Sequence, residues 1–185
     1  MGVELRSRTW QWNLLPDRAK KSLISADRDW FSGTEARVES ILNDLKITCE
    51  EMLLRGLWRP LADWLNHGGI EHQEKQAFLT LRIELQTKGM SPDLYHFEQV
   101  CKMPITYIFL KEKGISLLEL EWFSQGLVNS LSKLRLVRNQ AEHTSVTGWT
   151  RQGVKQYFDE FLGIGRPGVL LRLAKILFAY GKTAK

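Results

Sequence analysis

The sequence has few cysteines, no long hydrophobic run and little that predicts β-strands. Cys49 and Cys101 form neither a CxxC pair nor a disulfide framework, so we expect both to be reduced and buried. No apolar run approaches the roughly 18 residues that a transmembrane helix needs. Met1–Arg6 lacks the apolar core of a signal peptide and the Ser or Thr of a myristoylation signal. These absences predict a cytoplasmic protein without a membrane partner.

Hairpin turns of the Asn-Gly or Asp-Gly type are also missing between alternating segments, which disfavours an antiparallel sheet. The chain otherwise has ordinary globular composition, with 185 residues of which 43% are hydrophobic and 25% charged. Such a chain fits one domain with a sizeable core. The net charge of +5 permits contact with nucleic acid, but a mildly basic solvated surface gives the same value.

Helix signals recur along the chain instead. Pro16 and Asp17 open a first helix, because proline suits the first turn and an acid suits its positive end. An apolar stripe over 38–57 predicts a long second helix, with a kink or break near Arg59–Pro60 because proline has no N–H. Ser116 opens another long helix, which ends near residue 143.

Shorter helices are expected between and after these two. Residues 71–88 form one that ends at Gly89, with apolar positions from Ala77 to Leu85. Ser91–Pro92 predicts the cap and first turn of the next. Met103–Phe109 fits either a short extended piece or a helical turn. Two further helices are predicted, one after the cap Thr150 and one over about Val169 to Tyr180.

The predicted fold class is therefore all-α, an up-and-down helical bundle with two long antiparallel helices, about 34–58 and 117–143, at its centre. We expect an N-terminal arm over 1–15, the helical domain over 16–181 and a tail over 182–185. The seven tryptophans fit a large core, but several lie outside the periodic stripes and fit, as an alternative, a surface for a dimer or partner. These are Trp10, Trp12, Trp122 and Trp149.

The end of the second long helix carries the segment Arg-Asn-Gln-Ala-Glu-His, residues 138–143, followed by a loop. This segment resembles the signature of the HEPN superfamily, which is an Arg, usually a polar residue next, and a His separated from the Arg by four to six residues. Here these are Arg138, Asn139 and His143, with four residues between Arg and His. The spacing alone occurs by chance in many chains; its place at the end of a long core helix makes it a candidate site.

The residue types suit cleavage of RNA without a metal, in which the 2′-hydroxyl attacks the adjacent phosphate. His143 can move protons near neutral pH, and Arg138 offers a planar fork to the charge that builds on phosphorus. Asn139 shares a helix face with His143 and can orient its ring or bond the phosphate. The resemblance implies an endoribonuclease that leaves a cyclic phosphate and a 5′-hydroxyl, in a defence, toxin or stress-response system.

Helix geometry adds a condition to this interpretation. Arg138 and His143 lie about 140° apart around one helix, so one copy does not aim both at one phosphate. A two-fold homodimer would bring two copies of each into one cleft, as the resemblance also implies. In a toxin subset of the family a Tyr two residues after the His is modified by an antitoxin, but here that residue is Ser145. We therefore do not expect that mode of control.

Basic residues near the segment either track an RNA backbone or form a solvated rim. They are Lys133, Arg135, Arg151 and Lys155. No cofactor is expected, and a metal site at His67 and His72 lacks a third ligand. The glycine pattern over 163–168 has no preceding strand and contains Pro167, so it is not a dinucleotide fingerprint.

Structural roles for the candidate residues remain an alternative. Arg138 and Glu142 are spaced for a surface ion pair, His143 suits a helix C-terminus, and Asn139 can bond the backbone. In that case the chain is a non-catalytic helical module that binds a protein, a nucleotide or a nucleic acid. A further alternative is that the chain is the terminal domain of a longer parent protein.

Overall fold

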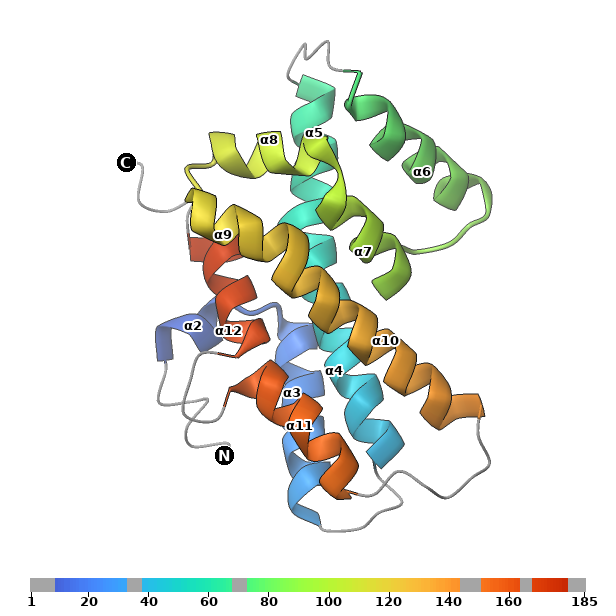
Figure 1. Ribbon diagram of the computed structural model, residues 1–185, viewed down its shortest axis with the longest axis vertical. Helices are drawn as coiled ribbons and strands as arrows, with labels where there is room; N and C mark the ends of the chain where they lie inside the picture. Colours follow the sequence, from blue (N-terminus) through green and yellow to red (C-terminus); the bar gives the residue numbers. More distant parts are fainter. Residues whose placement is uncertain (1–8, 33–37, 68–72, 144–150, 164–167, 180–185) are drawn as a thin grey trace.

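The computed structural model describes residues 9–32, 38–67, 73–143, 151–163 and 168–179, and at 9–11, 141–143 and 151 it describes the backbone alone. Every regular element in these ranges is a helix, which confirms the all-α fold class (Figure 1). Across the same ranges, none of the helices combines the length and the apolar character that crossing a membrane requires.

Two long helical rods form the centre of the bundle, as the apolar stripes predict. One comprises α4 (Val38–Leu53), the π-helical η2 (Leu54–Trp58) and α5 (Arg59–His67). The other comprises α9 (Leu117–Glu121), the π-helical η3 (Trp122–Leu127) and α10 (Val128–His143). The two rods run in opposite directions and cross (Figure 1).

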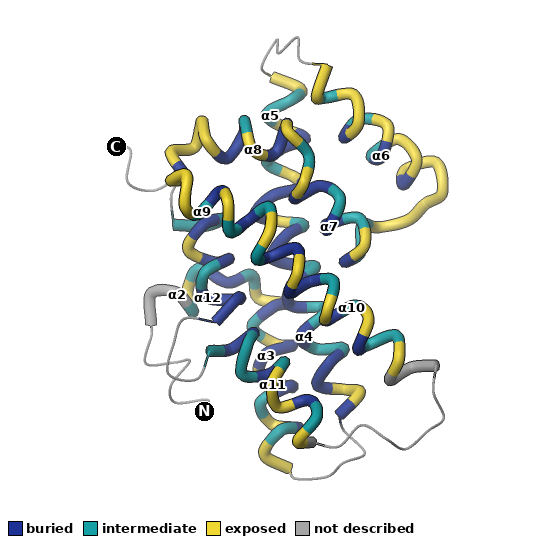
Figure 2. The backbone as a smooth tube through the Cα atoms, viewed as in Figure 1, coloured by how far each residue is buried: buried dark blue, intermediate teal, exposed yellow. Residues whose placement is uncertain are grey.

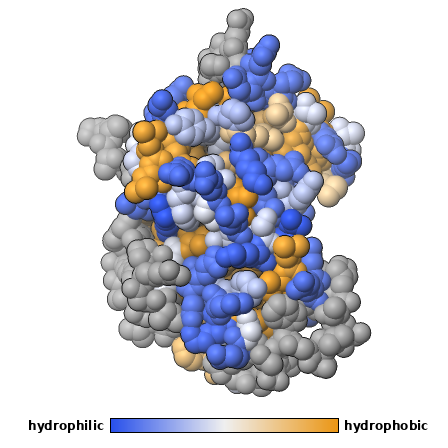
Figure 3. Space-filling model, viewed as in Figure 1, coloured by the Kyte–Doolittle hydropathy of each residue, from blue (hydrophilic) through white to orange (hydrophobic). Residues whose placement is uncertain are grey.

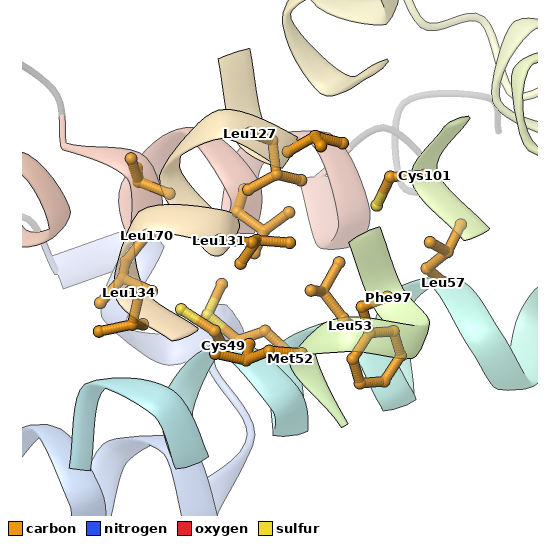
Figure 4. Close-up of a cluster of buried hydrophobic side chains, with 14 of the residues drawn as sticks. Cys49, Met52, Leu53, Leu57, Phe97, Cys101, Leu127, Leu131, Leu134 and Leu170 are labelled. Atoms are coloured by element: carbon orange, nitrogen blue, oxygen red, sulfur yellow. The ribbon is translucent and has the colours of Figure 1, made fainter. Parts of the chain in front are cut away.

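Side chains from both rods meet in the core, where they exclude water from a large apolar cluster. Cys49, Met52 and Leu53 of the first rod face Leu131 and its neighbours on the second (Figure 4). Every member of the predicted stripe is buried, namely Val38, Ile41, Leu42, Leu45, Cys49, Met52, Leu53 and Leu57. Dark blue inner faces along α3, α4 and α10 show the same burial (Figure 2).

The break expected near Pro60 takes the form of the π-helical η2, which ends two residues before it. The N–H of Arg59 donates to the carbonyl of Leu54, five residues back, so the turn before the proline is wide. Pro60 has no N–H to donate to the helix. The wide turn before it changes the hydrogen bonding locally, and the helix continues through the proline without a break.

Shorter helices pack around the two rods. α3 (Asp17–Ser32) lies along α4, and the ring of its Trp30 stacks on Phe158 of α11 (Arg151–Leu162) with centroids 4.5 Å apart. α7 (Leu94–Lys102) packs against both α4 and α10. The remaining elements are α2 (Thr9–Leu14), α6 (Lys75–Thr87), α8 (Pro104–Glu112), α12 (Val169–Ala174) and the π-helical η4 (Lys175–Ala179).

Several local predictions change. Met103 is extended and residues 104–109 are helical, since Pro104 opens α8 at its first turn, where its missing N–H has no intrahelical partner to lose. The cap before α7 is Asp93 and not Ser91, because the Asp93 carboxylate accepts the N–H of His96 at 3.2 Å. Ala77 is exposed, since Phe78 and Leu81 occupy the inner face of α6. The predicted cap Thr150 lies outside the described residues, as does Thr34, where the first long helix was expected to begin.

Two of the tryptophans outside the periodic stripes have described side chains, and both contact the core. Trp12 and Trp122 are half-buried and pack against the core. The guanidinium of Arg172 lies over the Trp122 ring, 4.3 Å from its centroid. These rings therefore cover the core of their own chain. The side chains of Trp10 and Trp149 lie outside the described part of the molecule.

Candidate functional site

The segment 138–143 continues α10 beyond the core. Val137 is the last buried residue among the described side chains of α10, and helical backbone runs on to His143. Arg138 and Asn139 are half-buried, and Gln140 is exposed. The side chains of Glu142 and His143, and all of Ser145, lie outside the described residues. The segment thus stands where the second rod leaves the bundle.

Arg138 and Asn139 lie on two different rows of α10. Arg138 follows the fully buried Leu131 and Leu134 by seven and four residues, so it continues the core-facing row. Asn139 follows Arg135 by four residues and continues the row that faces α7. The helix position of His143 continues that second row. The predicted divergence of Arg138 from His143 around the helix therefore holds for the α10 backbone.

A buried carboxylate anchors the α7-facing row. Glu98 of α7 is only 6% exposed, and it accepts hydrogen bonds from Nε of Arg135 at 2.7 Å and from Nη2 at 3.3 Å. The Ser132 hydroxyl donates to the same carboxylate at 2.7 Å. The hydrogen bond to Glu98 raises the pKa of Arg135 above its ordinary value. The Arg135 guanidinium is thereby held in one orientation.

The N-terminus of α7 lies beside this ion pair and carries further polar groups. Nδ1 of His96 lies 2.6 Å from the Asp93 carboxylate in a capping box. Glu50 of α4 accepts the N–H of Leu94 at 3.1 Å, and burial raises the pKa of this carboxyl despite the nearby Lys46. The start of α7 is thus fixed both by its own cap and by a carboxylate from the first rod.

The predicted RNA-tracking residues have carboxylate partners wherever their side chains are described. Lys133 lies 3.7 Å from Glu160, which also accepts the Ser130 hydroxyl. Lys155 pairs with Asp159 one turn further along α11. Arg135 pairs with Glu98, and the side chain of Arg151 lies outside the described residues. Lys133 and Lys155 remain exposed enough to meet a ligand, whereas Arg135 is committed to Glu98.

Glu98 and Tyr95 are the residues near the segment that sequence reasoning missed. Glu98 follows Leu94 by four residues and precedes Cys101 by three, and both neighbours are buried. That helical spacing indicates a buried acid, which needs a cation or several donors. Nothing in the local sequence identifies Arg135 as that cation, since the two residues are 37 positions apart.

An exposed apolar surface lies away from residues 138–143. Apolar surface on the face shown in Figure 3 gathers over the start of α9, where Leu117 and Leu118 are exposed. In Figure 1 this region lies at the opposite end of the second rod from residues 138–143.

Within the described ranges no group of three or more His, Cys, Asp or Glu side chains is arranged to hold a metal ion. His67 bonds the carbonyl of Asp63, and His72 lies outside those ranges.

Comparison of the chain with protein-family models, curated proteins and solved structures finds no match. The functional assignment therefore rests on the end of α10 and the residues around it.

Proposed function

We propose that the chain is a metal-independent endoribonuclease of the HEPN type, acting as a homodimer in the cytoplasm. The observation that carries this proposal is the position of residues 138–143, which directly follow Val137, the last buried side chain described on the second rod. Arg138 and Asn139 are half-buried there, beside the Glu98–Arg135 ion pair that holds α10 to α7. Such a placement favours a fixed site over a solvated helix end.

The proposed reaction needs only proton transfer and charge stabilisation. The 2′-oxygen of one nucleotide attacks its own 3′-phosphorus, and the bond from phosphorus to the next 5′-oxygen breaks. One imidazole takes the proton from the 2′-hydroxyl, and an imidazolium returns a proton to the leaving 5′-oxygen. The products are a 2′,3′-cyclic phosphate and a 5′-hydroxyl. Arg138 stabilises the negative charge on the phosphorane oxygens.

Dimerisation supplies what one chain lacks. Arg138 and His143 diverge around α10 by about 140°, so two groups from one helix do not converge on one phosphate. A two-fold axis along the ends of two α10 helices would set the arginine of one subunit opposite the histidine of the other. Sedimentation of the purified chain is then expected to give a dimer at the concentrations where RNA is cut.

The test is cleavage of single-stranded RNA in excess chelator. We expect His143→Ala to lower the rate by about 100-fold or more, since a positioned acid or base contributes roughly that much. Arg138→Ala should also abolish cleavage because the charge on phosphorus loses its cation. His67→Ala, at the exposed end of α5, is the matched control and should cut like the wild type.

Two results would overturn the proposal. One is a wild-type dimer that leaves every RNA intact. The other is a His143→Ala variant that cuts as well as the wild type. A product with a 3′-hydroxyl in place of the cyclic phosphate would also exclude attack by the 2′-oxygen.

A non-catalytic binding module is the second candidate function, in a defence, toxin or stress-response system like the first. The observation that favours it is the pairing of Lys133, Arg135 and Lys155 with carboxylates, which lowers the positive charge available to RNA phosphates. This candidate predicts that the chain binds its partner without turnover. The same chelator assay separates the two, because a binding module gives complexes with intact RNA.

A further inference from the structure

An exposed aromatic ring lies against the Glu98–Arg135 ion pair. α7 and α10 run side by side on the face seen in Figure 1, and Tyr95 belongs to the first turn of α7. Its side chain is 51% exposed. The guanidinium carbon of Arg135 lies 5.5 Å from the centre of the tyrosine ring, within the range of a cation–π contact.

Arg135 and Tyr95 are each held in place by neighbouring side chains. The buried Glu98 carboxylate accepts hydrogen bonds from two nitrogens of Arg135. These bonds keep the guanidinium from turning toward a phosphate. On the other side the His96 ring meets Tyr95 edge-on, with centroids 5.5 Å apart and planes at 74°. His96 is itself fixed by Asp93. Little side-chain freedom is therefore left to lose when a ligand stacks on the tyrosine.

Arg135 lies on the α7-facing row of α10, which also contains Asn139 and the helix position of His143. Asn139 lies one turn beyond Arg135, and His143 lies about two turns beyond it. The rise along the helix axis from Arg135 to His143 is therefore roughly 12 Å. An RNA strand with one phosphate at His143 would therefore place a neighbouring nucleotide at Tyr95 and Arg135.

We propose that Tyr95 and Arg135 form a stacking platform for an unpaired nucleobase of single-stranded RNA, beside the nucleotide that is cut. This inference rests on the proposed function. Unpaired bases stack on aromatic rings and on arginine planes, whereas the bases of a duplex keep their faces covered. An arginine whose charge is balanced by a buried carboxylate suits stacking better than phosphate capture. The platform selects unpaired RNA with little preference for one base.

Binding is measured first, in a His143→Ala background that leaves the RNA intact. A fluorescent single-stranded oligonucleotide is titrated, and its anisotropy gives the dissociation constant. We expect Tyr95→Ala to weaken binding by about 5- to 150-fold, the usual effect of removing one stacked base. Tyr95→Phe keeps the ring and should stay within about 2-fold, as its stacking surface is unchanged. Tyr107→Ala is the matched control, since Tyr107 is a 41% exposed tyrosine on α8.

An abasic scan distinguishes stacking from a general loss of affinity. Oligonucleotides that lack one base at a time should bind more weakly when the gap falls at the platform. Tyr95→Ala should be insensitive to that same gap, because the partner of the base is already gone. In the active protein the substitution should raise KM more than it lowers kcat, since the ring touches no reacting atom.

The outcomes separate this inference from the proposed function. If the wild type cuts RNA and Tyr95→Ala binds and cuts equally well, the platform is wrong and the nuclease stands. If the wild type binds RNA without cutting and Tyr95→Ala weakens that binding, the nuclease is wrong and the platform stands. If the wild type neither cuts nor binds RNA, both are wrong. A Tyr95→Ala variant that binds duplex and single strands with equal loss also overturns the platform, because a duplex offers no free base.

Discussion

Glu98 has a structural role that must be separated from any role in catalysis. Its carboxylate is buried and accepts three hydrogen bonds from two residues of α10. A buried acid is tolerated only with such partners, since an unpaired charge in the core is costly. Glu98 therefore fixes the distance and register between α7 and α10, and with them the position of Arg135.

Glu98→Ala should destabilise the fold because it leaves Arg135 and Ser132 without their acceptor. Loss of one partner of a buried pair costs about 3 to 5 kcal/mol. Arg135 is partly exposed and recovers some hydration, so we expect about 2 to 3 kcal/mol in urea unfolding. Glu84→Ala is the matched control, because the Glu84–Lys88 pair is exposed on both sides and its loss should cost less than about 1 kcal/mol. Equal losses for the two variants would contradict this account of Glu98.

At the scale of elements, the π-helical segments bring helices close together. Gly56 lies in η2, and a Cβ atom there would stand 2.6 Å from Cβ of Leu177 in η4. Real Cβ atoms do not approach so closely, so the glycine is what lets η4 lie on η2. The packing of the C-terminal element on the first rod thus depends on a residue that is a poor helix former.

Gly56→Ala tests that contact. In an open helix position the change would stabilise by about 1 kcal/mol through helix propensity. Here the added methyl group overlaps Leu177, and we expect a net loss of about 1 to 3 kcal/mol, with a lower melting temperature. Calorimetry of the variant and the wild type measures the change in melting temperature. A rise in melting temperature would show that η4 shifts without cost and that the close approach is not needed.

The elements that sequence predicts well are those with strong periodic stripes. The helices over 17–32, 38–53 and 128–143 carry apolar residues at three- and four-residue steps, and burial of one face follows directly. The π segments were not predicted, because a single inserted residue leaves the apolar pattern almost unchanged. The sequence leaves the helix over 104–109 ambiguous because short apolar runs fit strands and buried helices alike.

One part of the candidate site can be located from the sequence and another part cannot. The segment 138–143 is contiguous, so its position at a helix end can be read from the sequence. Contacts between α7 and α10 depend on how two distant helices pack, and the sequence does not give that packing. Glu98, Tyr95 and Arg135 therefore come together only in three dimensions.

At the scale of the whole molecule, the two thiols lie where only unfolding exposes them. Cys49 on α4 and Cys101 on α7 are buried in the central cluster (Figure 4). Burial raises the pKa of both thiols far above the ordinary value, so neither supplies a reactive thiolate near neutral pH.

Labelling of these thiols should therefore follow global unfolding. In native buffer at pH 8 we expect a disulfide reagent such as DTNB to react with both cysteines slowly and at one common rate. In denaturant both should react at once, because the unfolded thiols regain a pKa near about 8.5. Rapid labelling of either cysteine in native buffer would mean that its surroundings open locally, which the packing of α4 against α7 does not predict.

The helix α6 differs from the rest of the bundle in how little of it is covered. Its buried side chains are Phe78, Leu81 and Leu85, with Phe78 tilted against Trp58, while much of its length faces solvent (Figure 2). By comparison, α4 buries more than half of its residues. We therefore expect α6 to open more readily than the rest of the bundle. Detaching α6 leaves the two rods paired, so it would form a unit of local unfolding separate from the bundle that carries the site.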